Sequence, residues 1–301
     1  MMHWSIIDKV GGNMQDKIFE QVTGRIIQAL EKGVVPWKKP WTSLTPQNIK
    51  GRPYTGINRL LLNLNQYKYP IFLTMKQGND LGGYVKKGEK SHIAVFWKVM
   101  TYKDRNSNGE ETVKHVPYLR YYNVFNIDQT TVPISAVKNV QIRSDGEIES
   151  TDPIRNAKEL ITSMKDIPEI EFNAVKACYI PAIDKIMLPH QNLFQSDAEF
   201  YATEFHELIH STGHVKRLDR KGIQEVRFGS DVYSKEELIA EIGACFLSSL
   251  CGMNGVFENS AAYVQGWIKA LKNDPRMVVH AAAHAEKGVD FLCGHASQPS
   301  R

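Results

Sequence analysis

Cysteine is scarce in this chain of 301 residues, and none of its cysteines forms a C-x-x-C pair. A small disulfide-stabilised fold would need paired cysteines at framework spacing, so the sequence argues against one. We expect buried, reduced thiols at Cys178, Cys245, Cys251 and Cys293.

Long apolar runs are also absent. No stretch approaches the roughly 18 to 20 uninterrupted apolar residues of a membrane span, and no signal-peptide pattern opens the chain. Internal repeats and low-complexity tracts are not visible. The composition, 42% hydrophobic and 23% charged, is that of a folded globular protein. We therefore expect a cytoplasmic protein without a membrane partner.

Charge is divided unevenly along the chain. Residues 1–135 hold 19 Lys and Arg against 10 Asp and Glu, a balance of +9, whereas residues 136–301 hold 18 against 23, a balance of −5. A basic half beside an acidic half suggests that the first half meets a polyanion. The alternative is a solvated basic face without a partner.

The length and texture of the chain predict an α+β protein with two domains. Residues 1–130 form the first domain. Apolar density falls over residues 131–151, which we interpret as a linker. Residues 152–301 form the second domain, and each domain is long enough for its own core.

Periodicity predicts the main elements of both domains. In the first domain, we expect a helix at Met14–Lys32. Paired strands are expected at Ile93–Met100 and Tyr118–Phe125, with a turn at Asn106–Gly109 between them. In the second, periodicity indicates a helix capped by Asp152, strands at Phe172–Ile180 and Lys185–Leu188, and two helices launched by capping boxes at Ser196–Glu199 and Ser234–Glu237.

The first of these two capped helices contains His206-Glu207-Leu208-Ile209-His210. Histidines four apart lie on one helical face, so both imidazoles can reach one zinc ion. Glu207 then lies beside the open position, where it can accept a proton from water and return it to a leaving amine. The pattern predicts a zinc-dependent metallopeptidase with Glu207 as the catalytic residue.

A third ligand is expected from Glu237 or Glu241, which lie four apart on the next predicted helix. The arrangement resembles the gluzincin peptidases, in which a Glu-x-x-x-Asp pair completes the site. That resemblance makes Glu237 the ligand and Glu241 the partner that holds a ligating histidine. Here glutamate stands where those peptidases have aspartate, and Glu237 also occupies a capping position, so the two roles could be exchanged.

Other candidates carry weaker signals. His214 follows a glycine that should end the helix, and we expect His280 and His284 to serve packing. Tyr233 and Tyr263 could each stabilise a transition state by polarising a substrate carbonyl. By analogy of fold, an edge strand in the hairpin Tyr179–Leu188 could bind an extended peptide.

Cations alternate with aromatic rings in the basic half, a combination suited to single-stranded nucleic acid. The tryptophans fit a core role equally well. The expected DNA-binding residues are Trp37, Lys38, Lys39, Trp41, Arg52, Tyr54, Asn58, Lys86, Lys87 and Lys90.

Several phrases resemble the ArdC family of plasmid antirestriction proteins and related primase-type Tra proteins. The phrases run in the same order through nearly the whole chain, at Leu30–Trp37, Tyr54–Asn58, Leu81–Lys90, Tyr122–Asn126 and His206–His214. The resemblance implies an N-terminal domain that binds single-stranded DNA and a zincin-like C-terminal domain with one zinc ion, replaceable by manganese or cobalt. It also implies a mobile-element protein that protects incoming DNA from restriction and that could enter the recipient cell with that DNA.

Two other functions fit the same residues. One is a DNA-activated protease that removes proteins from DNA, as Spartan-type repair proteases do. The other is a DNA-binding protein whose zinc site is not catalytic, although a purely structural site has no need of Glu207. The protein substrate, whether a host restriction enzyme or another DNA-bound protein, stays open.

Overall fold

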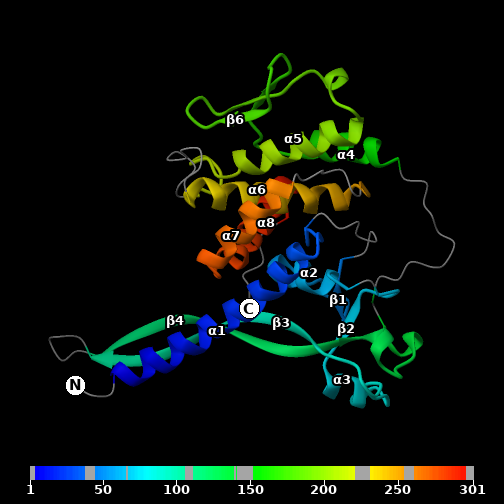
Figure 1. Cartoon of the computed structure of the whole chain (residues 1–301), viewed down its shortest axis with the longest axis vertical. Helices are drawn as coiled ribbons and strands as arrows, with labels where there is room; N and C mark the ends of the chain where they lie inside the picture. Colours follow the sequence, from blue (N-terminus) through cyan, green and yellow to red (C-terminus); the bar gives the residue numbers. More distant parts are fainter. Residues whose placement is uncertain are drawn as a thin grey trace.

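The computed structural model describes residues 4–37, 45–65, 67–105, 111–138, 140, 152–220, 231–253 and 261–295. Helices and small sheets alternate in both halves, which confirms the α+β class (Figure 1). Within these residues, no helix has the length and apolar character needed to cross a membrane.

The first long helix, α1 (Trp4–Glu31), begins well before the predicted Met14. Its apolar spacing places Ile18, Val22 and Ile26 on a buried face. Gly33 follows with φ +74°, a left-handed conformation that glycine adopts without steric cost. Its amide donates to the carbonyl of Leu30, and this turn ends the helix.

The first half is built on a four-stranded sheet of order β1-β2-β4-β3. Its strands are β1 (Gln47–Asn48), β2 (Ile71–Leu73), β3 (His92–Arg105) and β4 (Glu111–Asn126). The predicted antiparallel pair is confirmed and is longer than expected, forming a hairpin that projects from the rest of the chain (Figure 1). The predicted turn at 106–109 lies outside the described residues.

Short helices flank this sheet, namely α2 (Gly56–Asn63) and α3 (Met75–Asp80), with 3-10 turns η1 (Ile127–Gln129) and η2 (Ile134–Ala136) after β4. Val132 and Val137 are buried with Ile71 and Leu73 of β2. The start of the expected linker therefore packs on the first half. Residues 141–151 lie outside the described part, so the domain boundary stays a prediction.

The second half opens with α4 (Pro153–Ser163), whose N-terminus is capped by Asp152 as predicted. A three-stranded sheet of order β5-β7-β6 follows, with β5 (Glu169–Glu171), β6 (Cys178–Ile180) and β7 (Lys185–Met187). The strand expected over Phe172–Ile180 is wrong before Cys178. The prediction rested on the β-branched and aromatic residues of that stretch. Val175 is 95% exposed, so these residues do not form a buried strand.

After η3 (Gln191–Leu193), the second half is helical, with α5 (Asp197–Ser211), α6 (Asp231–Leu250), α7 (Ala261–Asn273) and α8 (Met277–Leu292). Ser196 caps α5 by accepting the Glu199 amide, but the Glu199 carboxylate accepts the amide of Gln195 and leaves the capping box incomplete. The capping box predicted at Ser234 is wrong because α6 already begins at Asp231.

The two halves share a core, contrary to the expectation of one core each. A single cluster of buried side chains contains residues of α1 and α2 together with residues of α5 to α8. Arg59 of α2 lies 4.2 Å above the ring centre of Phe246 in α6. The Gly56 amide donates to the Glu286 carboxylate of α8 at 3.0 Å. Helix α2 therefore joins the β3 side of the first half to the helices of the second.

Candidate metal centre

Two histidines of α5 face one point. His206 and His210 are separated by one helical turn, and their Nε2 atoms lie 3.0 Å apart. The helix is fixed by its buried apolar side chains, among them Phe205, Leu208 and Ile209, which pack into the shared core. The imidazoles keep about a sixth of their surface or less exposed, at 17% and 13%.

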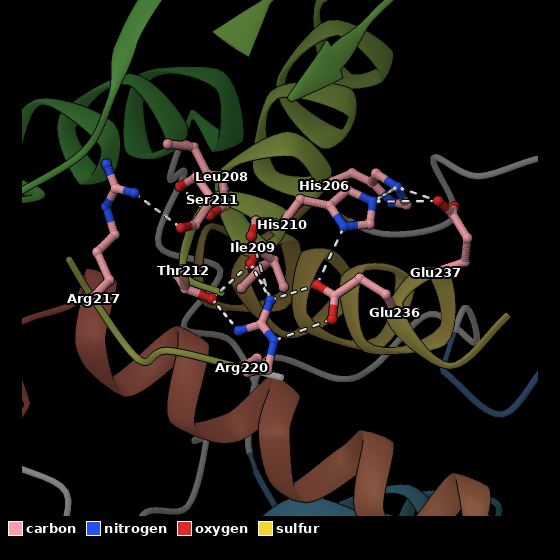
Figure 2. Close-up of polar contacts among 10 residues, drawn as sticks. All are labelled: His206, Leu208, Ile209, His210, Ser211, Thr212, Arg217, Arg220, Glu236 and Glu237. Carbon is pink, nitrogen blue, oxygen red and sulfur yellow. Dashed lines mark hydrogen bonds and ion pairs between the residues drawn. The ribbon is translucent and has the colours of Figure 1, made fainter. Parts of the chain in front are cut away.

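Glu237 of α6 completes the group (Figure 2). Its Oε2 lies 3.6 Å from Nε2 of His206, and its Oε1 lies 3.5 Å from Nε2 of His210. The three potential ligand atoms lie within 4.8 Å of one another, and no other such group occurs in the described ranges. Two imidazoles and one carboxylate are a donor set that suits zinc and similar divalent ions.

The pKa values of His210 and Glu237 are shifted in opposite directions. Burial would lower the pKa of His210, but hydrogen bonds to Glu236 and Glu237 raise it to about 10. Burial would raise the pKa of Glu237, but hydrogen bonds from His206 and His210 bring it far below its ordinary value. Both shifts favour contact between His210 and Glu237 as oppositely charged groups.

Glu236 and Arg220, for which no role was predicted from the sequence, support this group. Glu236 Oε1 lies 3.4 Å from Nδ1 of His210, the ring nitrogen that faces away from Glu237. Arg220 holds this carboxylate with Nη2 at 2.5 Å and Nε at 3.2 Å, and also donates to the Thr212 hydroxyl at 2.6 Å (Figure 2). Glu236 thus takes the position beside His210 that we expected for Glu241.

Glu241 is itself buried, one turn beyond Glu237 on α6. Its predicted contact with a ligating histidine stays a prediction. The sequence does show a second acid, Glu236, beside Glu237. Because the helix was predicted to start with a capping box at Ser234, this turn was interpreted as part of the cap. The role of Arg220 could not be predicted from its neighbours in sequence, because its partner Glu236 lies on α6.

Glu207 lies on α5 between the two histidines and is 7% exposed. Burial and the charge of Glu207 both raise the pKa of the Cys178 thiol. Cys178 is exposed, contrary to the expectation of a buried thiol. Within the described residues, β6 is an outer strand of its sheet, and it packs on α5, the helix that carries Glu207.

Three other histidines, His214, His280 and His284, are not part of the metal group. His214 Nδ1 lies 3.7 Å from the Asp184 carboxylate. The ring of His280 stacks on Phe19 with a centroid distance of 6.1 Å, and His284 is half-buried. Positions 233 and 263 fall near the starts of α6 and α7, but the side chains of these two tyrosines lie outside the described part of the structure.

Two expected DNA-binding residues serve the interior instead. Trp37 is fully buried and packs edge to face on Trp267 at 6.4 Å, so it cannot stack on a base. The Asn58 side chain is hydrogen-bonded to both the amide and the carbonyl of Val95 in β3. Lys38, Lys39 and Trp41 lie outside the described residues.

The other expected DNA-binding residues are accessible to different degrees. Arg52, Lys87 and Lys90 are exposed, and Tyr54 is half-buried. Lys86 is exposed as well, although its Nζ donates to the carbonyl of Asp128 at 2.8 Å. These side chains stay candidates for phosphate or base contacts.

The fold and the metal group define the second half as a zincin-like domain. The family "Zincin-like metallopeptidase" matches residues 156–284, and "N-terminal domain of anti-restriction factor ArdC" matches residues 16–125. The chain belongs to the ArdC antirestriction family. The chain is similar to the crystal structure of antirestriction protein ArdC from plasmid R388 in its metal-free form. The two share 35% sequence identity with a TM-score of 0.69, and the match covers 92% of this chain and 97% of that one.

Other relatives agree. The Mn(II)-bound structure of the same R388 protein has a TM-score of 0.70 at 35% identity and covers 93% of this chain and 98% of that one. DNA primase TraC of Escherichia coli is 34% identical over 91% of this chain, which spans only 27% of TraC. The uncharacterized protein y4eC of Sinorhizobium fredii is 29% identical, covering 93% of this chain and 92% of that protein.

Proposed function

We propose that this protein binds single-stranded DNA through its first half and hydrolyses a protein substrate at the metal centre, and that it protects incoming DNA from host restriction. The convergence of His206, His210 and Glu237 beside the buried Glu207 carries the enzymatic part. The basic charge of the first half supports the DNA-binding part. We place its action in the cytoplasm.

Zinc is the proposed metal, held by His206, His210 and Glu237. The donor atoms fit it, since three protein ligands of this kind leave a position open for catalysis. Manganese or cobalt could replace it, and the R388 relative has a structure with Mn(II) bound. Bound zinc would supply Lewis acidity, which polarises a substrate carbonyl and makes water easier to deprotonate.

The chain's own residues divide the remaining work. Glu207 takes a proton from the attacking water and passes it to the leaving amine. Glu236, fixed by Arg220, holds His210 through Nδ1 and so keeps its Nε2 directed at Glu237. The free edge of β6 would bind an extended substrate by backbone hydrogen bonds next to Glu207.

A DNA-activated protease is the second candidate. It is favoured by the position of α2, which is bonded to β3 through Asn58 and to α8 through the Gly56 amide. Single-stranded DNA bound to the first half could thus change the arrangement of the helices that hold the metal ligands. Proteolysis that requires single-stranded DNA would support this candidate, and equal proteolysis without DNA would reject it.

Glu207→Gln separates catalysis from binding. The substitution should leave zinc content and DNA binding unchanged and abolish proteolysis, because only proton transfer needs the carboxylate. In a plasmid-transfer assay, we expect protection to survive, since the basic first half offers a coating mechanism by itself. A variant that binds DNA normally but protects no better than an empty plasmid would show that proteolysis is required.

A further inference from the structure

The long hairpin of β3 and β4 has one face that is buried in the core and one face that is partly exposed. Residues directly opposite each other in an antiparallel pair point to the same side of the sheet. The pairs Ala94 with Tyr122, Phe96 with Arg120 and Lys98 with Tyr118 therefore share one face. Their neighbours in sequence point to the other face, where Ile93, Val95 and Leu119 are buried in the shared core with α1 and α2.

Among the described residues, the first face is covered only near the body of the domain. There Ala94 packs with Leu62 of α2 and Phe72 of β2, and Tyr54 and Tyr122 pack at the margin of this small cluster. Further along the hairpin the covering ends. Phe96 is 37% exposed, Tyr118 and Tyr122 are half-buried, and Lys98 and Arg120 are exposed. We call these last five side chains the hairpin strip.

Aromatic contacts occur both at the covered end and within the hairpin strip. Tyr54 meets Phe72 at 6.3 Å between ring centroids, and Phe96 meets Tyr122 at 5.7 Å. The guanidinium of Arg120 lies 5.8 Å from the ring centre of Tyr118. Phe96 and Arg120 are also directly paired across the two strands, so a ring and a cation lie side by side at the centre of the strip.

The charge of the strip is of one sign. Between residues 94 and 98 and between 118 and 122, the sequence contains no Asp or Glu. In the described part of the chain, neither Lys98 nor Arg120 forms an ion pair with a carboxylate. Exposed rings beside unneutralised cations are the combination that stacks unpaired bases and neutralises their phosphates.

We propose that the hairpin strip is a binding surface for single-stranded DNA, with Phe96, Tyr118 and Tyr122 stacking on bases and Lys98 and Arg120 contacting phosphates. This rests on the proposed DNA binding and names its surface. Sheet faces that carry exposed aromatic rings bind about two or three bases in other single-strand binders. A duplex fits poorly, because its bases are already stacked and present no free ring faces.

The test measures binding of a fluorescent oligo-dT by full-length protein at several salt concentrations. Phe96→Ala should weaken binding at least about fivefold, the lower end of the loss per stacked base, and leave the salt dependence unchanged. Arg120→Ala should reduce the slope of log K against log salt by about 0.7, as expected for one lost phosphate contact. Both variants should keep wild-type thermal stability and metal content.

Two matched controls are available. Tyr121 lies next to Arg120 on the same strand, is 46% exposed and points to the opposite face, so Tyr121→Ala should bind as wild type does. Arg155→Ala removes an exposed guanidinium from α4 and should leave the salt slope unchanged. Lys87→Ala tests whether the predicted loop cations contribute separately from the strip.

The outcomes separate the two proposals. If wild-type protein does not bind oligo-dT, the proposed DNA binding fails as a whole. If wild-type protein binds and Phe96→Ala binds equally well, the hairpin strip is the wrong surface although DNA binding stands. Equal losses for Phe96→Ala and Tyr121→Ala would point to a general effect on the hairpin. Equal losses on single-stranded and duplex DNA would refute stacking.

Discussion

The Arg220–Glu236 pair allows a quantitative test of how the metal ligands are held. Both side chains are buried, at 4% and 9% exposed, and the carboxylate receives two N–H groups of the guanidinium. Removing one member of such a pair leaves a buried charge without its partner, which costs about 3–5 kcal/mol. We therefore expect Arg220→Met and Glu236→Leu each to lower the free energy of unfolding by that amount.

The double variant should cost clearly less than the sum of the two single losses, because no unpaired charge then stays inside. Some loss should remain, since the Thr212 hydroxyl and the Ile209 carbonyl also bond to Arg220. The assay is urea denaturation of the metal-free protein for wild type, both single variants and the double variant. Additive losses would refute the inferred pairing.

A second measurement distinguishes positioning from mere stability. Because Glu236 contacts Nδ1 of His210, Glu236→Leu should weaken zinc binding about 10- to 100-fold under conditions in which the variant is fully folded. Calorimetric titration of zinc into the folded protein gives this number. Unchanged zinc affinity would show that Glu236 does not orient the ligand.

Three further predictions concern the centre and its supports. His206→Ala should lose most bound zinc in metal analysis, and full retention would refute the ligand assignment. Gly243→Ala should cost about 1–3 kcal/mol, because a Cβ there would lie 2.7 Å from Cδ1 of Ile209, whereas Gly266→Ala, with no atom within 4 Å, should be neutral or stabilising in the same urea series. Burial would raise the pKa of Asp184, but bonds from Arg217 and Tyr179 lower it, so its stabilising effect is present above the ordinary carboxyl pKa and is lost on acidification below it. Asp184→Asn should therefore reduce the loss of stability below about pH 4, and an unchanged acid limb of the stability curve would contradict this.

Local spacing predicted that His206 and His210 converge, because one helical turn sets the distance between them. The choice of Glu237 over Glu241 came from the resemblance to the gluzincin peptidases. The outer contacts were harder to predict. Arg220 and Glu236 are 16 residues apart in the sequence, and no periodic pattern records such a contact. The start of α6 was misplaced because Ser234 and Glu237 satisfy a capping pattern inside a longer helix.

The first half of the chain shows a similar limit. Runs such as Trp37-Lys38 look alike in sequence whether the ring is a core anchor or a surface group, and the structure buries Trp37. The run Arg120-Tyr121-Tyr122 already combines a cation with aromatic rings in the sequence. The hairpin strip as a whole was not predicted, because its members alternate along two strands and become one surface only when the strands pair. Pairing register is set by the fold, whereas composition records only that the ingredients are present.

The shared core has a consequence for how such chains can recombine. Helices α1 and α2 complete the interior of the second half, so each half carries apolar side chains shaped for its counterpart. A chimera that exchanged one half between relatives would create voids and clashes around Arg59 and Phe246 unless the facing helices were exchanged too. The two halves of the chain should therefore be inherited together. The match to TraC fits that expectation, since both halves align together within a much longer polypeptide.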